Sequence, residues 1–298
     1  MGVGYSCVDM ICMVEDFPVE DSSTHITSRV VQGGGAVATA LVAASRLGTK
    51  CAFIGNIGND IMSDETIRMF QSDGVCTDYM VRRDDCYGLE SIVMVNPANG
   101  SRTKFPQRDY NPPISWDDRL SNAIGGCCIL HLDGTHYENA INAARIAKEH
   151  GVLVSLDGCS MQKDNEKNKT LATMADILIM NSKYPLKVSG KATYDEALLE
   201  MSTWGIKKVV GCTLGDKGSK FVVGGRVVDF PSFKAKSVVD TTGCGDVFHG
   251  AFLSAYVSGM ALEKCIRFAS ATACCKCAVP GGRAGIPNRD VVLGIIGE

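Results

Sequence analysis

Short apolar runs alternate with longer amphipathic segments along the second half of the chain. The runs are bounded by polar residues or glycine and are rich in branched apolar side chains, as buried strands are. They cover residues 127–132, 152–156, 177–180 and 209–213. A helical pattern at 137–150 follows the first run, and Gly151 comes directly after it. Strands that alternate with helices predict a doubly wound α/β fold, in which helices cover both faces of a mainly parallel sheet.

The first half of the chain follows the same scheme. Residues 1–11 predict a first buried strand, residues 33–47 are rich in glycine and then helical, and residues 51–55 form the next apolar run. No internal repeat, low-complexity tract or linker interrupts the sequence. We therefore expect residues 1–298 to form a single α/β domain.

Two segments interrupt the alternation and predict a second, smaller sheet. Strand patterns occur at 26–31, 89–95 and 101–105. Between the last two, Asn99-Gly100 is typical of a hairpin turn. We expect the segments at about 12–32 and 86–106 to pair with each other as a small β-sheet beside the main one.

Composition and charge exclude several classes of protein. The 298-residue chain has a net charge of −3, which argues against a surface for nucleic acid or anionic membranes. No apolar run reaches the roughly 18 residues that a membrane-spanning helix needs. The N-terminus lacks the features of a secretion signal. We therefore expect a cytoplasmic protein whose 14 cysteines are reduced thiols rather than a disulfide framework.

The strongest chemical signal is a run of small residues before an apolar helical stretch at 247–257. Gly243, Cys244 and Gly245 leave their backbone N–H groups open to a ligand, and a helix N-terminus adds partial positive charge. This arrangement binds phosphates. Asp246 stands at the junction, where a carboxylate could remove a proton from a hydroxyl that attacks the phosphate. The alternative is a plain strand-to-helix turn with Asp246 as N-cap.

Other polar residues lie near the predicted carboxyl ends of strands. They are Asp9, Asp133, Asp157, Asn181 and Thr213. Taken one by one, each could be a helix cap or a loop residue. In open parallel sheets, however, ligands bind beyond the carboxyl ends of the strands, so these residues together predict one rim of a binding site.

The segment 240–246, Asp-Thr-Thr-Gly-Cys-Gly-Asp, resembles the C-terminal signature of the ribokinase / phosphofructokinase B family of carbohydrate kinases, with Cys244 in place of the usual Ala. Residues 33–40, which continue to Gly48, are similar to the N-terminal Gly-Gly motif of that family. Residues 53–60 are similar to the segment that follows the motif. The resemblance implies a ribokinase-like fold whose small sheet is a lid that covers a sugar and often mediates dimerisation.

The resemblance also implies roles for particular residues. Asp246 would be the catalytic base, and the backbone of Gly243, Cys244 and Gly245 would form the anion hole. The sugar would be bound by residues of the N-terminal motifs and the lid, namely Asp9, Gly34, Gly35, Thr39 and Lys104. Thr39 stands where the family commonly has Asn, so the usual recognition of a sugar hydroxyl is altered.

Nucleotide binding is implied for a turn after a strand and for two further positions. These residues are Thr213, Gly215, Gly218, Asn181 and Gly282, the last within a loop at 281–285 that resembles the one closing the adenine pocket. Tyr184 replaces the Glu of an Asn-x-x-Glu motif, so Mg²⁺ is expected to be held mainly by phosphates and water. Asp240 and Thr242 fall where some family members bind a monovalent cation such as K⁺.

The segments 33–40, 240–251 and 280–287 resemble the sulfofructose kinase-like branch of the family most closely. The positions corresponding to its sulfonate-binding residues are Ser23, Lys104 and Gly134, and two of these have lost their polar donor or charge. Lys104, Arg102 and Arg108 could meet another anionic group, or they could simply form a solvated lid face.

We therefore expect an ATP-dependent kinase that transfers the γ-phosphate to a primary hydroxyl of a small sugar, with a ketose favoured. ATP and Mg²⁺, with K⁺ as a candidate, are the expected cofactors, and a homodimer formed through the lid is expected, with no nucleic acid or membrane partner. The alternatives are a nucleoside kinase of the same superfamily and a non-catalytic sugar-binding relative. A dehydrogenase is disfavoured because Gly2-Val3-Gly4 lacks the third glycine of a dinucleotide-binding motif.

Overall fold

A large twisted sheet forms the centre of the computed structural model, which describes residues 1–96, 101–205, 208–235 and 237–297. From one edge to the other, its strands are β14 (Arg226–Phe230), β13 (Ser219–Val223), β12 (Val209–Thr213), β11 (Ile177–Met180), β10 (Leu153–Gly158), β9 (Ile129–Leu132), β1 (Gly2–Val3), β4 (Cys51–Ile57) and β5 (Val75–Cys76). A further strand, β6 (Met80–Arg82), pairs with β4. Pairing is parallel from β12 to β5, while β13 and β14 add an antiparallel edge that the sequence patterns did not predict.

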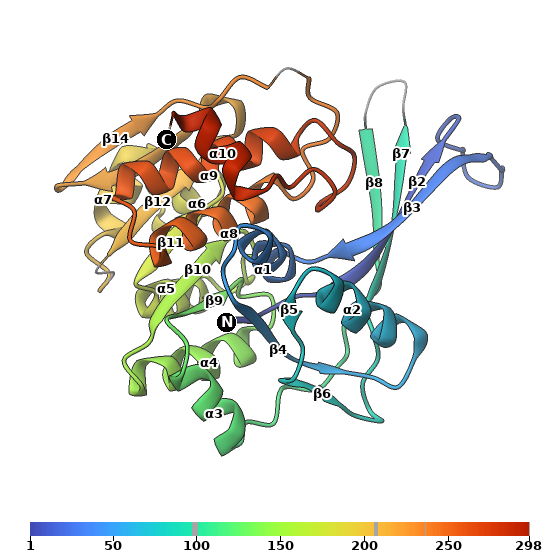
Figure 1. The fold of residues 1–298 in the computed structure, drawn as a ribbon, viewed down its shortest axis with the longest axis horizontal. Coiled ribbons are helices and arrows are strands. Elements are labelled where there is room, and N and C mark those ends of the chain that lie inside the picture. The colour runs from blue at the N-terminus through green and yellow to red at the C-terminus, as the bar shows by residue number, and fades with distance from the viewer. Residues whose placement is uncertain (97–100, 206–207, 236, 298) are drawn as a thin grey trace.

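Helices cover both faces of this sheet (Figure 1). One face packs on α1 (Ala36–Arg46), α8 (Cys244–Val257), α9 (Leu262–Lys276) and α10 (Arg289–Ile296), with α2 (Ile61–Ser72) beside α1. The other face packs on α3 (Asp118–Gly125), α4 (Tyr137–Glu149), α5 (Asn165–Met174), α6 (Tyr184–Ser189) and α7 (Tyr194–Met201). Strand β11 shows how the sequence achieves this, because Ile177 and Ile179 join one core while Leu178 and Met180 join the other. The doubly wound fold is therefore confirmed.

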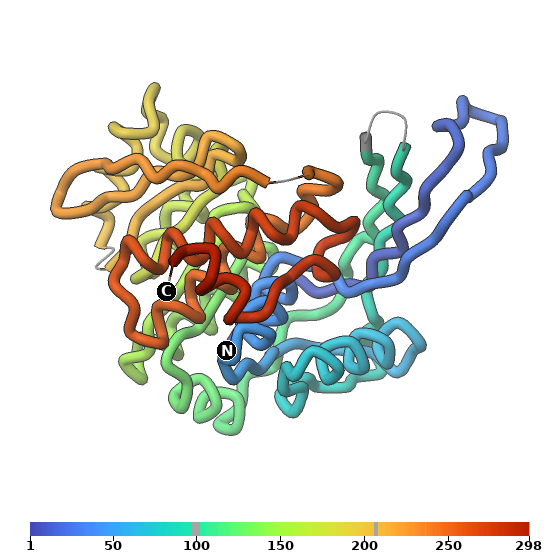
Figure 2. The backbone as a smooth tube through the Cα atoms, turned by 45° about the horizontal axis from the view of Figure 1, so that its top comes forward, coloured from blue at the N-terminus to red at the C-terminus, as the bar shows by residue number. Residues whose placement is uncertain are grey.

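A smaller sheet projects from the body at the segments predicted to form a lid, and we call it the lid. Its strands are β3 (Ile26–Gly34), β2 (Cys7–Val14), β7 (Glu90–Asn96) and β8 (Ser101–Pro106), in that order. Figure 2 shows these four strands leaving the body side by side. Strand β2 is antiparallel to β3 and parallel to β7, which is antiparallel to β8. The predicted Asn99-Gly100 turn lies outside the described residues.

The prediction of one buried strand over residues 1–11 was wrong. The chain leaves the main sheet after β1 and enters the lid as β2, so Asp9 belongs to a lid strand and not to the end of a central one. The break occurs where the backbone meets Asp133. The Tyr5 N–H donates to Asp133 Oδ2 over 2.9 Å, and a Cβ on Gly4 would lie 2.7 Å from the same oxygen. Because Asp133 follows β9, only the folded chain brings it to this point.

No helix in the described part of the chain is both long enough and apolar enough to cross a bilayer.

Candidate active site

The N-terminus of α8 is open for a ligand. Gly243 is its N-cap residue, with a left-handed φ of 74°, and no side chain caps this end of the helix. Asp246 lies in the first turn, so it is not the N-cap that the plain-turn alternative required. Helix geometry leaves the first-turn N–H groups of Gly245 and Asp246 without carbonyl partners one turn back, while that of Cys244 makes only a long 3.3 Å bond to the Thr241 carbonyl. The turn thus presents donors and positive partial charge to an anion.

The carboxyl group of Asp246 has the properties of a general base. The pKa of Asp246 is raised to about 7, chiefly by burial and also by the nearby carboxylates of Asp157 and Asp133, while the charges of His249 and Lys104 oppose the rise. Near neutral pH a large fraction of the carboxyl groups is therefore deprotonated yet basic enough to accept a proton.

A buried polar cluster lies beneath Asp246. The Asp157 carboxylate is 3.2 Å from His249 Nε2, and His131 Nδ1 is 3.1 Å from Ser155 Oγ. Burial by itself would raise the pKa of Asp157, but the adjacent His249 ring keeps it below its usual range. Asp157 therefore supports the site from below and does not line its open rim.

Asp133 also belongs to the supporting layer. It is fully buried and accepts hydrogen bonds from the backbone N–H groups of Tyr5 and Thr135, each 2.9 Å long. Of the five rim residues that the sequence predicted, Asp133 and Asp157 thus serve the framework beneath the cleft.

Most of the sugar-binding candidates lie at the base of the lid, and Lys104 connects them electrostatically with Asp246. Asp9 on β2 lies against Gly34 at the end of β3, where a Cβ would come within 2.3 Å of Asp9 Oδ2. Gly35 follows as the N-cap of α1, with a φ of 97°. Burial raises the pKa of Asp9, and the charge of Lys104 on β8 opposes that rise, as it does for Asp246. Both carboxyl groups therefore lie within electrostatic reach of the same lid lysine.

A buried arginine that the sequence patterns did not reveal supports this loop. Arg283 Nη2 donates to the Gly34 carbonyl over 3.0 Å, and its Nε lies 3.4 Å from Thr39 Oγ1. Thr39 is itself buried on α1, so its hydroxyl faces Arg283. The side chain of Arg283 thereby links the loop at 281–285 to the Gly-Gly loop of the lid.

The nucleotide-binding candidates follow neighbouring parallel strands. Asn181, after β11, accepts hydrogen bonds through Oδ1 from the backbone N–H groups of Lys183 and Tyr184 at the start of α6, at 2.9 and 3.0 Å. Thr213 ends β12 and leads into a short 3₁₀ helix, η1 (Gly215–Lys217). Gly218 has a φ of 88°, and a Cβ there would lie 2.1 Å from the Phe230 carbonyl oxygen. A residue with a side chain could not form this turn.

Two further nucleotide-site positions are placed by packing. Gly282 lies against the N-cap of α8, because a Cβ on Gly243 would be 2.9 Å from the Gly282 Cα atom. Tyr184 is buried in the core, and its hydroxyl donates to the Asn168 carbonyl over 3.2 Å. The residue that replaces the Glu of the family motif is thus committed to packing and cannot organise a metal ion.

Asp240 is surrounded by donors. Its Oδ1 accepts from the Thr242 N–H at 2.8 Å and from Arg102 Nη1 at 2.9 Å, while its Oδ2 accepts from the Gly281 N–H at 2.7 Å. Its backbone carbonyl accepts from Lys276 Nζ at 2.7 Å. Two cationic side chains that the site prediction had not assigned to it thus converge on the candidate monovalent-cation site.

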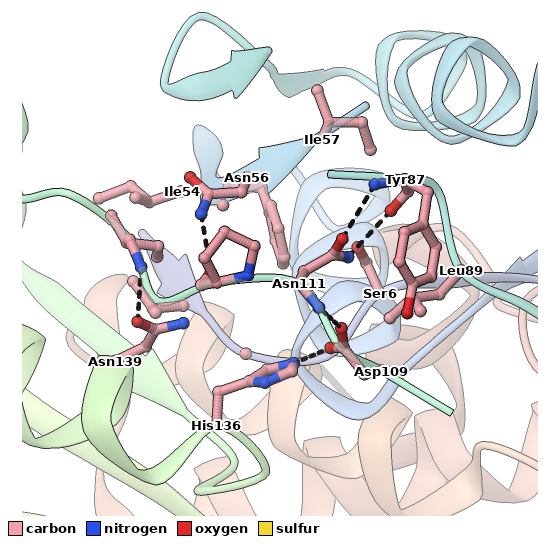
Figure 3. A pocket seen from close by; sticks show the side chains of 16 residues that line it. Ser6, Ile54, Asn56, Ile57, Tyr87, Leu89, Asp109, Asn111, His136 and Asn139 are labelled. Atoms are coloured by element: carbon pink, nitrogen blue, oxygen red, sulfur yellow. Dashed lines mark hydrogen bonds and ion pairs between the residues drawn. The ribbon is translucent and has the colours of Figure 1, made fainter. Parts of the chain in front are cut away.

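A partly open hollow of about 50 Å³ is lined by residues of β1, β4 and neighbouring loops (Figure 3). His136 and Asp109 form an ion pair of 2.9 Å on its wall, and the Asn111 side chain bonds the backbone of Tyr87 through both its oxygen and its nitrogen. The hollow shares no residue with the predicted site and is far smaller than the roughly 300–1,000 Å³ of ligand pockets. We therefore assign it no part in binding a nucleotide.

The family model for pfkB family carbohydrate kinases matches residues 1–289. The chain belongs to this family. It is 27% identical over 280 residues to the deoxyribokinase of Salmonella typhi, and the alignment covers 90% of each chain. It is also 25% identical over 298 residues to a nucleoside kinase of Methanothermobacter thermautotrophicus, and that alignment covers 97% of this chain and 92% of the other. Among solved structures it is similar to Arabidopsis thaliana ribokinase complexed with ribose and ATP, with a TM-score of 0.86, 26% identity and coverage of 99% and 97%.

Membership of the PfkB family confirms the interpretation of the signature at 240–246, and the protein is a carbohydrate kinase. The roles of the individual site residues remain predictions, as does the likeness to the sulfofructose kinase-like branch.

Proposed function

We propose that this PfkB kinase transfers the γ-phosphate of ATP to a primary hydroxyl of a small sugar, with a ketose favoured. The observation that carries the proposal is the position of Asp246. Its carboxyl group, with a pKa of about 7, stands in the first turn of a helix whose N-terminus has no side-chain cap. An acceptor hydroxyl and the terminal phosphate of a nucleotide can meet at this point.

Each part of the site has a place in the reaction. Asp9 and the Gly34 backbone would hold sugar hydroxyls, while Asp246 takes the proton from the attacking hydroxyl. The N–H groups at the start of α8 would stabilise the negative charge on the transferred phosphoryl group. The lid over the sugar would exclude water, which is the competing acceptor.

Magnesium would enter with the nucleotide. Among the described residues, no group of three or more His, Cys, Asp or Glu side chains is placed to hold a metal ion. When bound, Mg²⁺ would neutralise charge on the nucleotide phosphates, with water and phosphate oxygens as its main ligands. This chain would contribute the backbone turns at Gly215 and Gly218 that position those phosphates.

A substrate panel tests the function directly. We expect ATP turnover with at least one of ribose, 2-deoxyribose, fructose and tagatose, and the ketose preference predicts a higher kcat/KM for fructose or tagatose than for the aldoses. Faster turnover with adenosine or inosine would favour the nucleoside kinase alternative, which the similarity to an archaeal nucleoside kinase keeps open. Absence of turnover with every acceptor would overturn the proposal.

The pH dependence should report the state of Asp246. A general base acts only when it is deprotonated, and burial places the pKa of Asp246 at about 7. We therefore expect kcat/KM for the sugar to fall tenfold per pH unit well below pH 7 and to level off above about pH 8. His249→Asn removes a ring that lowers the pKa of Asp246. In this variant the acidic limb of the profile, where kcat/KM falls, should therefore lie at higher pH. His150→Asn, an exposed control, should leave it in place; a wild-type limb near pH 4 would contradict the assignment.

We further propose that the protein forms a homodimer through the lid. One cross-strand row on β3, β2, β7 and β8 consists of Val31, Met10, Ile92 and Phe105. The charge of Lys104 on β8 lowers the pKa of Asp9 and Asp246, so Lys104 lies on the face of the lid toward the site. Successive side chains of a strand alternate between its two faces, so Phe105 points away from the site. Val31, Ile92 and Phe105 are 41%, 37% and 53% exposed. A second copy of the chain, whose lid carries the same apolar row, would cover it.

Light scattering after size exclusion tests the dimer. The wild type should have the mass of a dimer, and Phe105→Lys should shift it toward the monomer while leaving the far-UV circular dichroism unchanged. Thr103→Lys, on the same strand but outside the apolar row, is the matched control. A wild type that stays monomeric at tens of micromolar would exclude this interface.

A further inference from the structure

The turn that precedes α8 is organised around a single aspartate. We use the term Asp240 turn for residues 239–243. The backbone N–H groups of Val239 and Asp240 both donate to the Cys277 carbonyl, over 2.8 and 3.1 Å. The side chain of Asp240 in turn holds the Thr242 and Gly281 N–H groups. These contacts place Gly243 and therefore the N–H groups at the start of α8.

A lysine ammonium group lies inside this structure. Lys276 is the last residue of α9 and is completely buried, with an exposed fraction of 0%. Its Nζ donates to the backbone carbonyl of Asp240 over 2.7 Å. Lysine is almost never fully buried without a compensating partner, because taking its charge out of water is costly. The nearby Asp240 carboxylate, whose pKa the charge of Lys276 helps to lower, supplies compensating negative charge.

The lid adds a second cation to the same aspartate. Arg102 on β8 donates through Nη1 to Asp240 Oδ1 over 2.9 Å and also contacts Thr242 Oγ1. Unlike Lys276, this side chain is partly exposed, with 32% of its area open to solvent. The lysine therefore holds the turn from within the body, while the arginine joins it to the lid.

These contacts decide whether a free monovalent cation fits. Such an ion would need several oxygen atoms directed at one point, and the expected site relies on the oxygens of Asp240 and Thr242. The Asp240 carbonyl is already bound to Lys276, and Asp240 Oδ1 and Thr242 Oγ1 are bound to Arg102. The residues present therefore do not fit a K⁺ site, in contrast to the expectation from the sequence.

We infer that the ammonium group of Lys276 is a built-in monovalent cation, which holds the Asp240 turn in the shape that α8 needs to bind a phosphate. Burial places this charge permanently behind the anion-binding turn, where a soluble ion would have to be bound. Its electric field reaches that turn, because the charge of Lys276 opposes the rise in the pKa of the Cys244 thiol that burial produces. The inference depends on the proposed function only in the test that measures kinase activity.

The first test compares cations at constant ionic strength. Wild-type activity should change less than twofold between potassium, ammonium, sodium and choline chloride. Lys276→Met keeps the length of the side chain but removes its charge. In choline chloride this variant should have a kcat about a hundredfold lower than wild type, because a shifted Asp240 turn would displace the anion-binding N–H groups at the start of α8. Potassium or ammonium chloride should raise the kcat of Lys276→Met at least tenfold above its value in choline chloride. Lys50→Met, an exposed lysine just before β4 at the opposite end of the sheet, is the control and should behave as wild type.

The second test does not need kinase activity. Thermal unfolding of Lys276→Met should shift to higher temperature in potassium chloride than in choline chloride, whereas the wild type should respond equally to the two salts. This result would support the inference even if no sugar is phosphorylated, so failure of the proposed function and failure of the inference are distinguishable. If Lys276→Met folds only in potassium or ammonium chloride, that also supports it.

Three outcomes would overturn the inference. They are several-fold activation of the wild type by potassium over choline, full activity of Lys276→Met in choline chloride, and a defect in Lys276→Met that no cation relieves in either assay. Lys276→Arg, which retains a positive charge, should keep the cation independence of the wild type.

Discussion

Replacement of Asp246 by Asn is expected to lower kcat by roughly 10³-fold, since a positioned general base contributes about 10²–10⁴-fold. The amide keeps the size of the side chain but cannot accept the proton of the attacking hydroxyl. KM for ATP should stay within a factor of about three, because the N–H groups at the start of α8 remain in place. Steady-state kinetics with the best sugar of the panel gives both values.

Stability separates loss of the base from loss of the fold. Because burial raises the folded-state pKa of Asp246 above its unfolded value, the ionised carboxylate destabilises the native protein, and this penalty grows as the pH rises through the unfolded and then the folded pKa. Asp246→Asn should therefore be at least as stable as wild type in urea at pH 8. Asp290→Asn, in the exposed first turn of α10, is the matched control and should keep full activity. Equal kcat in wild type and Asp246→Asn would defeat the assignment of the base.

The second large effect is expected at Asp9. Asp9→Asn should lower kcat/KM for the sugar by about 10²-fold, because hydrogen bonds to a charged group contribute about 1.5–3 kcal/mol and Asp9 is placed to accept more than one from sugar hydroxyls. Most of the loss should appear in KM for the sugar, with KM for ATP unchanged, since Asp9 belongs to the lid and the nucleotide candidates lie beyond β11 and β12.

Gly34→Ala provides an independent check of this pocket. The new Cβ would come within 2.3 Å of Asp9 Oδ2, so the carboxylate must move and KM for the sugar should rise as it does in Asp9→Asn. Glu90→Gln, which changes an exposed carboxylate on the neighbouring lid strand β7, is the control. Should Asp9→Asn bind the sugar as tightly as wild type in a direct titration, Asp9 has no role in recognition.

The local pattern of the chain predicted most of the framework correctly. The bounds predicted for β11 and β12, 177–180 and 209–213, agree with the structure, and the helix predicted at 137–150 corresponds to α4. Alternation of side chains across a strand and the turn period of a helix involve only neighbouring residues, so they are visible in the sequence. The same holds for the run of small residues before α8, whose conformation depends on glycine at 243.

Interactions between distant segments were not accessible in this way. Apolar residues occur on both sides of Tyr5 in the pattern at residues 1–11, and only Asp133 shows where the chain turns into the lid. Tyr184 stands at a motif position, yet its burial excludes it from the site. Arg102 contacts Asp240 across 138 residues of sequence, and no periodicity relates two such positions.

By itself, the sequence determined the alternation of strands and helices in the second half of the chain and the family, and it supplied the prediction that Asp246 is the base, because these depend on local spacing and on a continuous signature. Only the tertiary structure decided how charges are distributed around that base. Burial raises the pKa of Asp246, Arg283 donates to the Gly34 carbonyl, and Lys276 donates to the Asp240 carbonyl. The pKa of a group and its interactions with other charges depend on the groups packed around it in three dimensions, and these come from every part of the chain.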